Sequence, residues 1–169
     1  MRSAAEEMQR LPLDGLRVVD LSTWIAGAYC TKLLCDAGAD VTKVESHSGD
    51  PLRDWSASGA TITDGVNGAL YNFLAAHKQS VTVDPDNADE AAALHDMIGA
   101  SDLLVWSRGS AVAEHPGLSP QAIVRSHPHL TVVSITPCGL EGPWADKPAT
   151  EFTLQAWSGA MIGLGRGWV

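Results

Sequence analysis

Two small residues, Ala26 and Gly27, stand where a ligand could approach the backbone closely. They belong to residues 22–27, which follow an apolar run at 16–21 and precede a segment that stops at Gly38. This order predicts a strand, a tight turn and a helix. In parallel α/β folds, ligands bind at such turns, beside the N-terminus of the next helix. Small side chains leave the amide groups open to a ligand; ordinary turn chemistry is the alternative.

Two cations could meet an anionic ligand. Lys78 lies between a predicted helix and a predicted strand, from which an ammonium group can reach a phosphate; a solvated surface lysine is the alternative. Arg53 lies beside Asp50 and Trp55 in a long polar loop, residues 46–66, where a salt bridge is as good an explanation as a ligand contact. Loops of this length in compact domains are usually functional or disordered.

Strand-like and helix-like segments alternate along the chain. Short apolar runs predict strands at residues 16–21, 41–45, 80–83, 103–106 and 131–136. Capping and turn residues place helices at residues 28–37, 67–75, 88–98, 120–125 and 151–162. The alternation predicts an α/β fold, with a Rossmann-like parallel sheet covered by helices on both faces. Residues 22–27, residues 46–53 and Ser107 then gather at the carboxyl ends of the strands.

Composition excludes several classes of protein. The net charge is -9, and the 11 Lys and Arg residues are spread along the chain, which argues against a nucleic-acid partner. No apolar run approaches the roughly 18 residues of a membrane span. Residues 1–10 lack the apolar core of a signal peptide and are expected to form a short arm, so we expect a cytoplasmic protein.

The cysteines and histidines indicate no metal site. Cys30 and Cys35 would point apart on one helix, and an odd total of three cysteines leaves at least one unpaired. We expect reduced thiols packed in the core, at Cys30, Cys35 and Cys138. The six histidines are scattered and form no cluster with cysteine.

Several motifs occur in one order along residues 11–159. The longest reads L-x-G-x-R-V-x-D-L from Leu13, then A-G at Ala26, then C-T-x-L-L-x-D-x-G-A-D-V-x-K-V-E from Cys30. Shorter ones are G-D-P-L-R at 49–53, H-K-Q-S-V-T-V-D at 77–84, V-S-I-T-P-C-G-L-E-G-P at 133–143 and E-F-T-L-Q-A-W-S-G at 151–159. Together they resemble the opening of the class III CoA-transferase family, whose members move coenzyme A between carboxylic acids.

The resemblance implies a coenzyme A site. In the family, the pair at Ile25 and Ala26 touches the coenzyme, here by packing or backbone contact. Adenine and ribose-phosphate contacts fall near Ser46, near residues 83–86, and near Ser107, Arg108 and His115. Ser46 and His115 replace frequent arginines, and Arg108 could compensate with a bidentate phosphate contact. The expected coenzyme-binding residues are Ile25, Ala26, Gly27, Ser46, Lys78, Val83, Asp84, Ser107 and Arg108, with no catalytic residue and no metal ligand.

The related acyl-CoA racemases place a His-Asp pair where this chain has Thr150 and Glu151. Thr150 cannot act as the base for proton transfer. Glu151 is better explained as a first-turn acid that interacts favourably with the helix dipole. The racemase activity is therefore the less favoured alternative.

The resemblance also implies that the family's nucleophilic aspartate lies shortly beyond Val169. We expect residues 11–169 to be the truncated, N-terminal coenzyme-binding part of the large domain. When complete, the protein would transfer coenzyme A from an acyl-CoA to a carboxylic acid through an aspartyl intermediate. A non-catalytic coenzyme-binding module, a pseudo-enzyme, is the alternative. The expected partners are acyl-CoA, a carboxylic acid, and a second copy or a complementary chain.

Overall fold

The computed structural model describes residues 11–164 of the chain. It divides into two units, Met1–Ile135 and Thr136–Val169, which are treated separately below. The helices and strands of the first unit are β1 (Arg17–Asp20), α2 (Trp24–Asp36), β2 (Asp40–Glu45), α3 (Ala69–Ala75), β3 (Gln79–Thr82), α4 (Ala88–Gly99), β4 (Leu103–Ser107), α5 (Pro120–Ser126) and β5 (Thr131–Ile135). Single 3₁₀ turns at Pro51–Arg53 and Pro116–Leu118 complete it.

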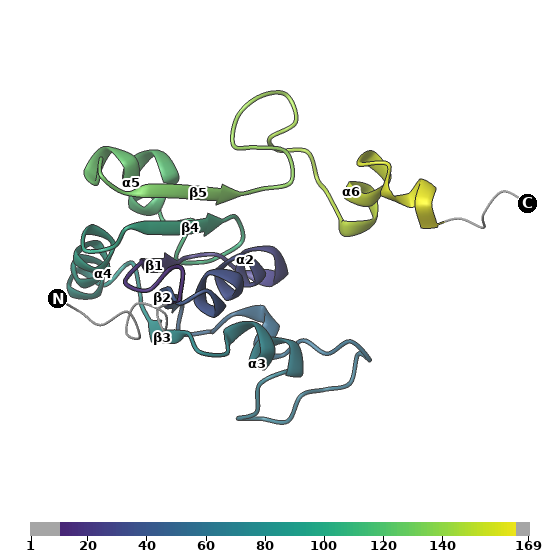
Figure 1. Cartoon of the computed structure of the whole chain (residues 1–169), viewed down its shortest axis with the longest axis horizontal. Helices are drawn as coiled ribbons and strands as arrows, with labels where there is room; N and C mark the ends of the chain where they lie inside the picture. Colours follow the sequence, from purple (N-terminus) through teal and green to yellow (C-terminus); the bar gives the residue numbers. More distant parts are fainter. Residues whose placement is uncertain (1–10, 165–169) are drawn as a thin grey trace, which may run out of the picture. The chain divides into compact units, whose positions relative to one another are not determined.

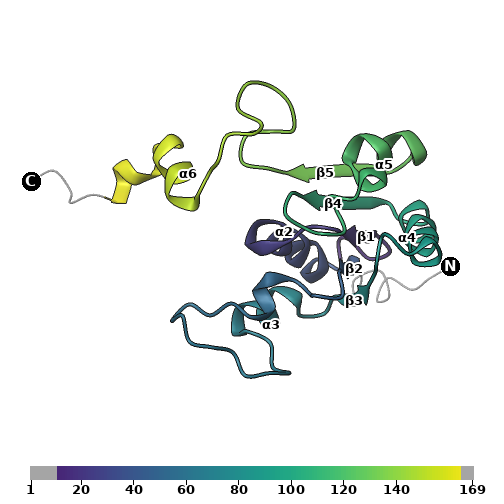
Figure 2. The same cartoon turned by 180° about the vertical axis from the view of Figure 1, so that it is seen from behind.

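The five strands form one parallel sheet in the order β3-β2-β1-β4-β5. Figures 1 and 2 show β4 and β5 side by side with their arrowheads in one direction. The strand order grows outward from β1 in both directions, and right-handed crossovers then place α2 and α3 on one face, with α4 and α5 on the other. The predicted parallel α/β fold is confirmed.

The face of the sheet beneath α2 changes character along the strands. At the amino ends it is apolar, because Val18 and Val41, which are paired in register, belong to a cluster that also contacts Leu34 of α2. Side chains two residues further along a strand point to the same face. These positions are Asp20 in β1 and Lys43 in β2, which are paired in register. The apolar floor therefore ends in buried charges at the carboxyl ends.

Helices α4 and α5 begin at the predicted residues, 88 and 120, and each follows a capping side chain. The Asn87 side chain accepts hydrogen bonds from the amides of Asp89 and Glu90, and Ser119 caps α5 ahead of Pro120. Leu94 and Ile98 of α4 lie one helical turn apart, and both are buried. Strand β5 forms one end of the sheet and is largely exposed, including Val133.

Helix α2 begins earlier than the sequence predicted. It starts at Trp24, so Ile25, Ala26 and Gly27 occupy its first turn and not the preceding loop. A Cβ atom at position 27 would lie 2.0 Å from Ser22 Oγ. Glycine is therefore required because the helix packs directly on the end of β1. The prediction took Ala26 and Gly27 as turn signals, whereas Gly27 permits close packing and Ala26 is exposed.

The second unit contains α6 (Glu151–Trp157) and a 3₁₀ segment, Ala160–Leu164. The predicted helix 151–162 is thus too long, because Gly159 adopts a positive φ of 77° and ends the regular turn. Thr150 caps α6 by accepting a hydrogen bond from the amide of Thr153. Lys147 lies over the rings of both Trp144 and Trp157.

Cys30, Cys35 and Cys138 are free thiols of intermediate exposure. Cys30 and Cys35 pack against the core cluster that contains Val18 and Val41, as expected, whereas Cys138 lies in the loop after β5. Burial raises the pKa of both Cys30 and Cys35. Among residues 11–164, no helix is both long and apolar enough to cross a bilayer, and no group of three or more acidic, histidine or cysteine side chains is arranged around a possible metal ion.

Candidate functional site

A pocket of about 110 Å³ lies at the carboxyl ends of the central strands. Its walls come from three loops, which follow β1, β2 and β4. The lining residues are Ser22, Thr23, Lys43, Val44, Glu45, Ser46, Ser48, Gly49, Asp50, Pro51, Gly109, Ser110 and Ala111. Strands β1 and β4 are the neighbours at which the strand order reverses, the position where open α/β sheets bind ligands. The loops gather at one edge, as the sequence predicted.

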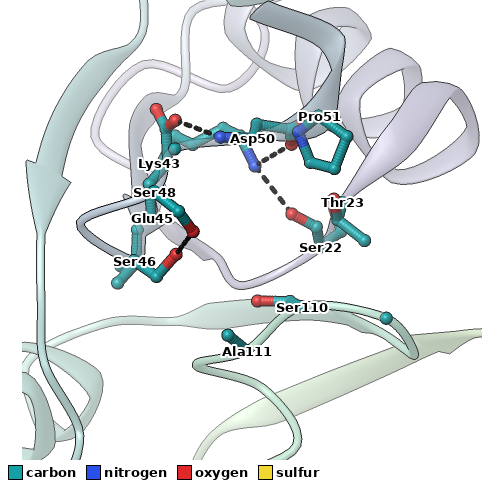
Figure 3. A pocket seen from close by; sticks show the side chains of 13 residues that line it. Ser22, Thr23, Lys43, Glu45, Ser46, Ser48, Asp50, Pro51, Ser110 and Ala111 are labelled. Carbon is teal, nitrogen blue, oxygen red and sulfur yellow. Dashed lines mark hydrogen bonds and ion pairs between the residues drawn. The ribbon is translucent and has the colours of Figure 1, made fainter.

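The Lys43 ammonium group lies between the β1 and β2 loops. Its Nζ donates to the Ser22 carbonyl oxygen at 2.6 Å and is 2.9 Å from Asp50 Oδ2. Figure 3 shows it between these two residues, with Ser110 and Ala111 across the pocket. The Lys43 and Asp50 side chains are 3% and 1% exposed. Asp50 Oδ2 has this ion pair but no geometrically regular hydrogen bond.

Glu45 organises the second loop. Its carboxylate accepts hydrogen bonds from Arg53 Nε at 2.7 Å and Nη2 at 2.8 Å, and from Tyr71, Ser80 and the Asp50 amide at 2.8 to 2.9 Å. Burial alone would raise the pKa of Glu45, but these donors stabilise its charged form and lower the pKa to about 2. Arg53 forms a salt bridge, with Glu45, which was one of its two predicted alternatives. The hydrogen bond to Glu45 raises the pKa of Arg53.

Asp20 organises the start of α2. It accepts hydrogen bonds from the Ser22 amide at 3.0 Å and the Thr31 hydroxyl at 2.6 Å, and also from the Ser22 hydroxyl. Lys78 Nζ is 3.4 Å from Asp20 Oδ2 and donates to Thr31 Oγ1 at 2.6 Å and the Ala28 carbonyl at 2.9 Å. The Lys78 side chain is 1% exposed. Burial lowers its pKa, and the charge of Asp20 opposes this effect.

Three carboxylates are thus matched by three cations. The pairs are Asp20 with Lys78, Asp50 with Lys43, and Glu45 with Arg53. Removing one member of a buried pair leaves the other charge uncompensated and typically costs about 3–5 kcal/mol. The charges of these six side chains therefore cancel in pairs, and the burial of each charge depends on its partner.

The residues that sequence reasoning placed at the site occupy different positions. Ser46 lines the pocket. Ser107 is buried below it, and its hydroxyl accepts a hydrogen bond from the Thr23 amide at 2.9 Å. Arg108 is exposed beside the lining residue Gly109. Ile25 and Ala26 are exposed on the first turn of α2.

The remaining expected residues lie away from the pocket lining. Gly27 is buried against Ser22, and Val83 is buried just after β3. The Asp84 amide donates to Glu90 at 2.8 Å. The alternative of a solvated lysine at position 78 is wrong, because its ammonium is enclosed by Asp20, Thr31 and Ala28. Coenzyme contacts for the expected residues stay predictions.

Sequence reasoning did not single out Lys43 or Ser110, whereas Thr23 and Ser48 lie within the predicted segments 22–27 and 46–53 but were not named individually. A signal for Lys43 was present in the alternation of Val41, Lys43 and Glu45 within a predicted buried strand. Charges at every second position of such a strand share one face and need buried partners.

The comparisons with known proteins agree with this architecture. The model of CoA-transferase family III matches residues 13–167. The chain belongs to this family. One curated relative, the succinate–glutarate CoA-transferase of Agrobacterium fabrum, is 31% identical over 89% of this chain and 38% of its own length. The beta subunit of the succinyl-CoA–L-malate CoA-transferase of Chloroflexus aurantiacus is 34% identical over 82% of this chain and 33% of its own length.

Two solved structures resemble the chain as well. A CAIB/BAIF family protein from Brucella suis has a TM-score of 0.78 and 31% identity, covering 90% of this chain and 40% of that one. A hypothetical protein from Mycobacterium tuberculosis has a TM-score of 0.72 and 27% identity, covering 93% of this chain and 42% of that one. The chain therefore spans about a third to two-fifths of the length of these relatives.

Glu45 predicts a defined pH dependence of stability. The pKa of Glu45 is about 2 in the folded chain, against 4.5 for an ordinary glutamate. Its ionised form therefore stabilises the folded chain fully above pH 4.5, and this contribution to the free energy of unfolding disappears as the pH falls towards 2. The depression corresponds to about 3 kcal/mol. Urea unfolding from pH 6 to pH 2 should show that wild type loses about that much more stability than Glu45→Gln. Parallel curves for the two proteins would contradict this role of Glu45.

Proposed function

We propose that this chain is the N-terminal, coenzyme-binding part of a class III CoA-transferase. In the complete protein, coenzyme A would pass from an acyl-CoA to a carboxylic acid through an aspartyl intermediate. The observation that carries the proposal is the pocket between the β1, β2 and β4 loops at the reversal point of the sheet. Family membership supports the proposed reaction, and the pocket supports the proposed place of the coenzyme.

The pocket offers donors suited to a phosphate group. The hydroxyls of Ser46, Ser48 and Ser110 belong to its lining. The N-cap residue of α2, Thr23, makes no side-chain capping bond, so the positive end of this 13-residue helix is available to attract an anion. A volume of about 110 Å³ suits one phosphate-sized group. The rest of the coenzyme would then extend over exposed Ile25 and Ala26.

Arg108 and Lys78 have different parts in the proposal. Arg108 is exposed next to the β4 loop, where its guanidinium group would hold phosphate. Lys78 would act without touching the coenzyme, because its ammonium group holds the Ala28 carbonyl and Asp20 and so fixes the start of α2. Ser107 would keep the β1 loop in place through the Thr23 amide. Val83 and Asp84 are proposed to lie on the adenine side.

An exposed apolar stripe supports assembly with a second polypeptide. Ile25, Tyr29 and Leu33 recur every four residues along α2 and are 48%, 49% and 52% exposed. Phe73 of the neighbouring α3 is 57% exposed, and apolar patches of this kind often mark interaction sites. Some relatives carry the names alpha and beta subunit of one CoA-transferase. We propose a homodimer or a complementary second chain, in the cytoplasm, where unpaired thiols such as Cys30 persist.

The racemase alternative loses support in the second unit. Thr150 is the N-cap of α6, and Glu151 lies in its first turn, where it hydrogen-bonds Gln155 at 2.8 Å. The pseudo-enzyme alternative and the transferase proposal both expect no nucleophile among the buried carboxylates of this chain. The buried carboxylates around the pocket, Asp20, Glu45 and Asp50, are each held in an ion pair, and a carboxylate so engaged is a poor nucleophile.

Calorimetric titration with coenzyme A tests the binding site. We expect the chain to bind the coenzyme, and Arg108→Ala to raise the Kd by about 10- to 100-fold, the cost of one charged hydrogen bond. Arg125→Ala is the matched control, because Arg125 is exposed on α5 and is not part of the pocket lining. No heat of binding at millimolar coenzyme A would refute the proposed site.

Light scattering tests the proposed assembly. The exposed stripe on α2 predicts a dimer or larger species at micromolar concentration. Tyr29→Glu and Leu33→Lys, which place charges on the stripe, should shift the population towards monomer. A wild-type protein that is monomeric under these conditions would argue against the stripe as an interface.

Hydroxylamine trapping tests where the chemistry resides. When residues 1–169 are mixed with an acyl-CoA and hydroxylamine, we expect no hydroxamate on the chain, because its buried carboxylates are engaged in ion pairs. Addition of a downstream polypeptide that carries the family's aspartate should restore trapping, on that polypeptide. A complete succinate–glutarate CoA-transferase serves as the reference. A hydroxamate on any residue of this chain, detected by mass spectrometry, would overturn the expectation.

A further inference from the structure

Buried contacts run in one line across the three loops of the pocket. Ser107, at the end of β4, holds the Thr23 amide at 2.9 Å. Thr23 follows Ser22, whose carbonyl oxygen accepts from Lys43 at 2.6 Å. Lys43 in turn is paired with Asp50 at 2.9 Å. Lys43 therefore provides the one link in this line that connects the β1 loop to the β2 loop.

The two groups on either side of Lys43 have little freedom of their own. Asp50 Oδ1 accepts from the Leu52 amide at 2.9 Å, and the Asp50 amide donates to Glu45 at 2.8 Å. Ser22 is held by Asp20 through its amide and lies directly against Gly27. Because both sides are fixed, the length of the Lys43 side chain sets the distance between them.

A gain in the free energy of unfolding is a weak explanation for the presence of the buried Lys43–Asp50 pair. Replacing both members of a buried ion pair by neutral groups of similar volume is often neutral or stabilising, because desolvation offsets the attraction between the charges. Neutral side chains do not reproduce the contacts that one ammonium group makes with two loops at once. The distinctive effect of Lys43 is therefore geometric.

We propose that Lys43 is a positioning residue that sets the spacing of the β1 and β2 loops and thereby the affinity of the pocket for the coenzyme. It acts through Ser22 and Asp50 and need not touch the ligand. The part concerning affinity rests on the proposed coenzyme site, whereas the part concerning loop spacing does not.

A neutralised pair separates positioning from stability. Lys43→Met alone leaves the buried Asp50 charge without its partner and should lower the Tm clearly. Lys43→Met/Asp50→Asn removes both charges and keeps the hydrogen bond from the Leu52 amide to Oδ1 of residue 50. It should therefore recover most of the loss in Tm. The double variant should nevertheless bind coenzyme A at least 10-fold more weakly than wild type. Amide hydrogen exchange in residues 46–53 should be faster in it, with α4 unchanged.

The matched control is Lys32→Met/Asp36→Asn, which neutralises an ion pair within α2 whose members do not line the pocket. It should leave both the Kd and the exchange of residues 46–53 unchanged. If the Lys43 double variant does not fold, Lys43→Arg replaces it, since a wider planar cation keeps the charge but not the spacing.

The outcomes separate the two proposals. Wild-type affinity and wild-type exchange in the double variant or in Lys43→Arg would overturn the positioning role. If wild type binds no coenzyme A, the proposed function fails, and hydrogen exchange of residues 46–53 still decides whether Lys43 sets the loop spacing.

Discussion

The fold around the pocket depends on the neutralisation of charges beneath α2. An apolar floor of valines would suffice to pack a helix on the sheet, yet at the carboxyl ends the same face carries Asp20, Lys43 and Glu45. Buried charges are tolerated only with partners and hydrogen bonds. The partners come from two other parts of the chain: Lys78 precedes β3, while Asp50 and Arg53 belong to the loop after β2. The charges thus bind the loops to the sheet.

This arrangement gives the loops order without regular secondary structure. The segment after β2 contains one 3₁₀ turn, and it is held by side chains that reach back to Glu45 and Lys43. Loops normally carry function because they are tolerant of change, while a rigid scaffold positions them. Here the rigid scaffold extends into the loop itself, through the buried ion pair of Lys43 with Asp50 and the half-buried pair of Arg53 with Glu45.

Local patterns were enough to predict the parallel sheet, the order of the helices and the caps of α4 and α5, since each depends on neighbouring residues. The start of α2 was misjudged because a glycine such as Gly27 carries the same signal whether it opens a turn or admits a close neighbour. The environment of Lys78 was beyond local reasoning, because its partners Asp20 and Thr31 are 58 and 47 residues away in the sequence. The salt bridge of Arg53 was one of two alternatives, and choosing between them required the position of Tyr71, whose ring lies 4.2 Å from the guanidinium carbon.

Strand β5 has a consequence for handling the protein. It is the last strand of the sheet on its side, and within the described residues only β4 pairs with it. The outer edge of such a strand presents a row of backbone donors and acceptors, which is a template for adding another strand. Natural edges are commonly protected by lysine, proline or a bulge, whereas β5 reads Thr-Val-Val-Ser-Ile and has none of these. At high concentration, strand-to-strand aggregation is therefore an inherent hazard of this chain, and a single lysine in place of exposed Val133 is the simplest safeguard against it.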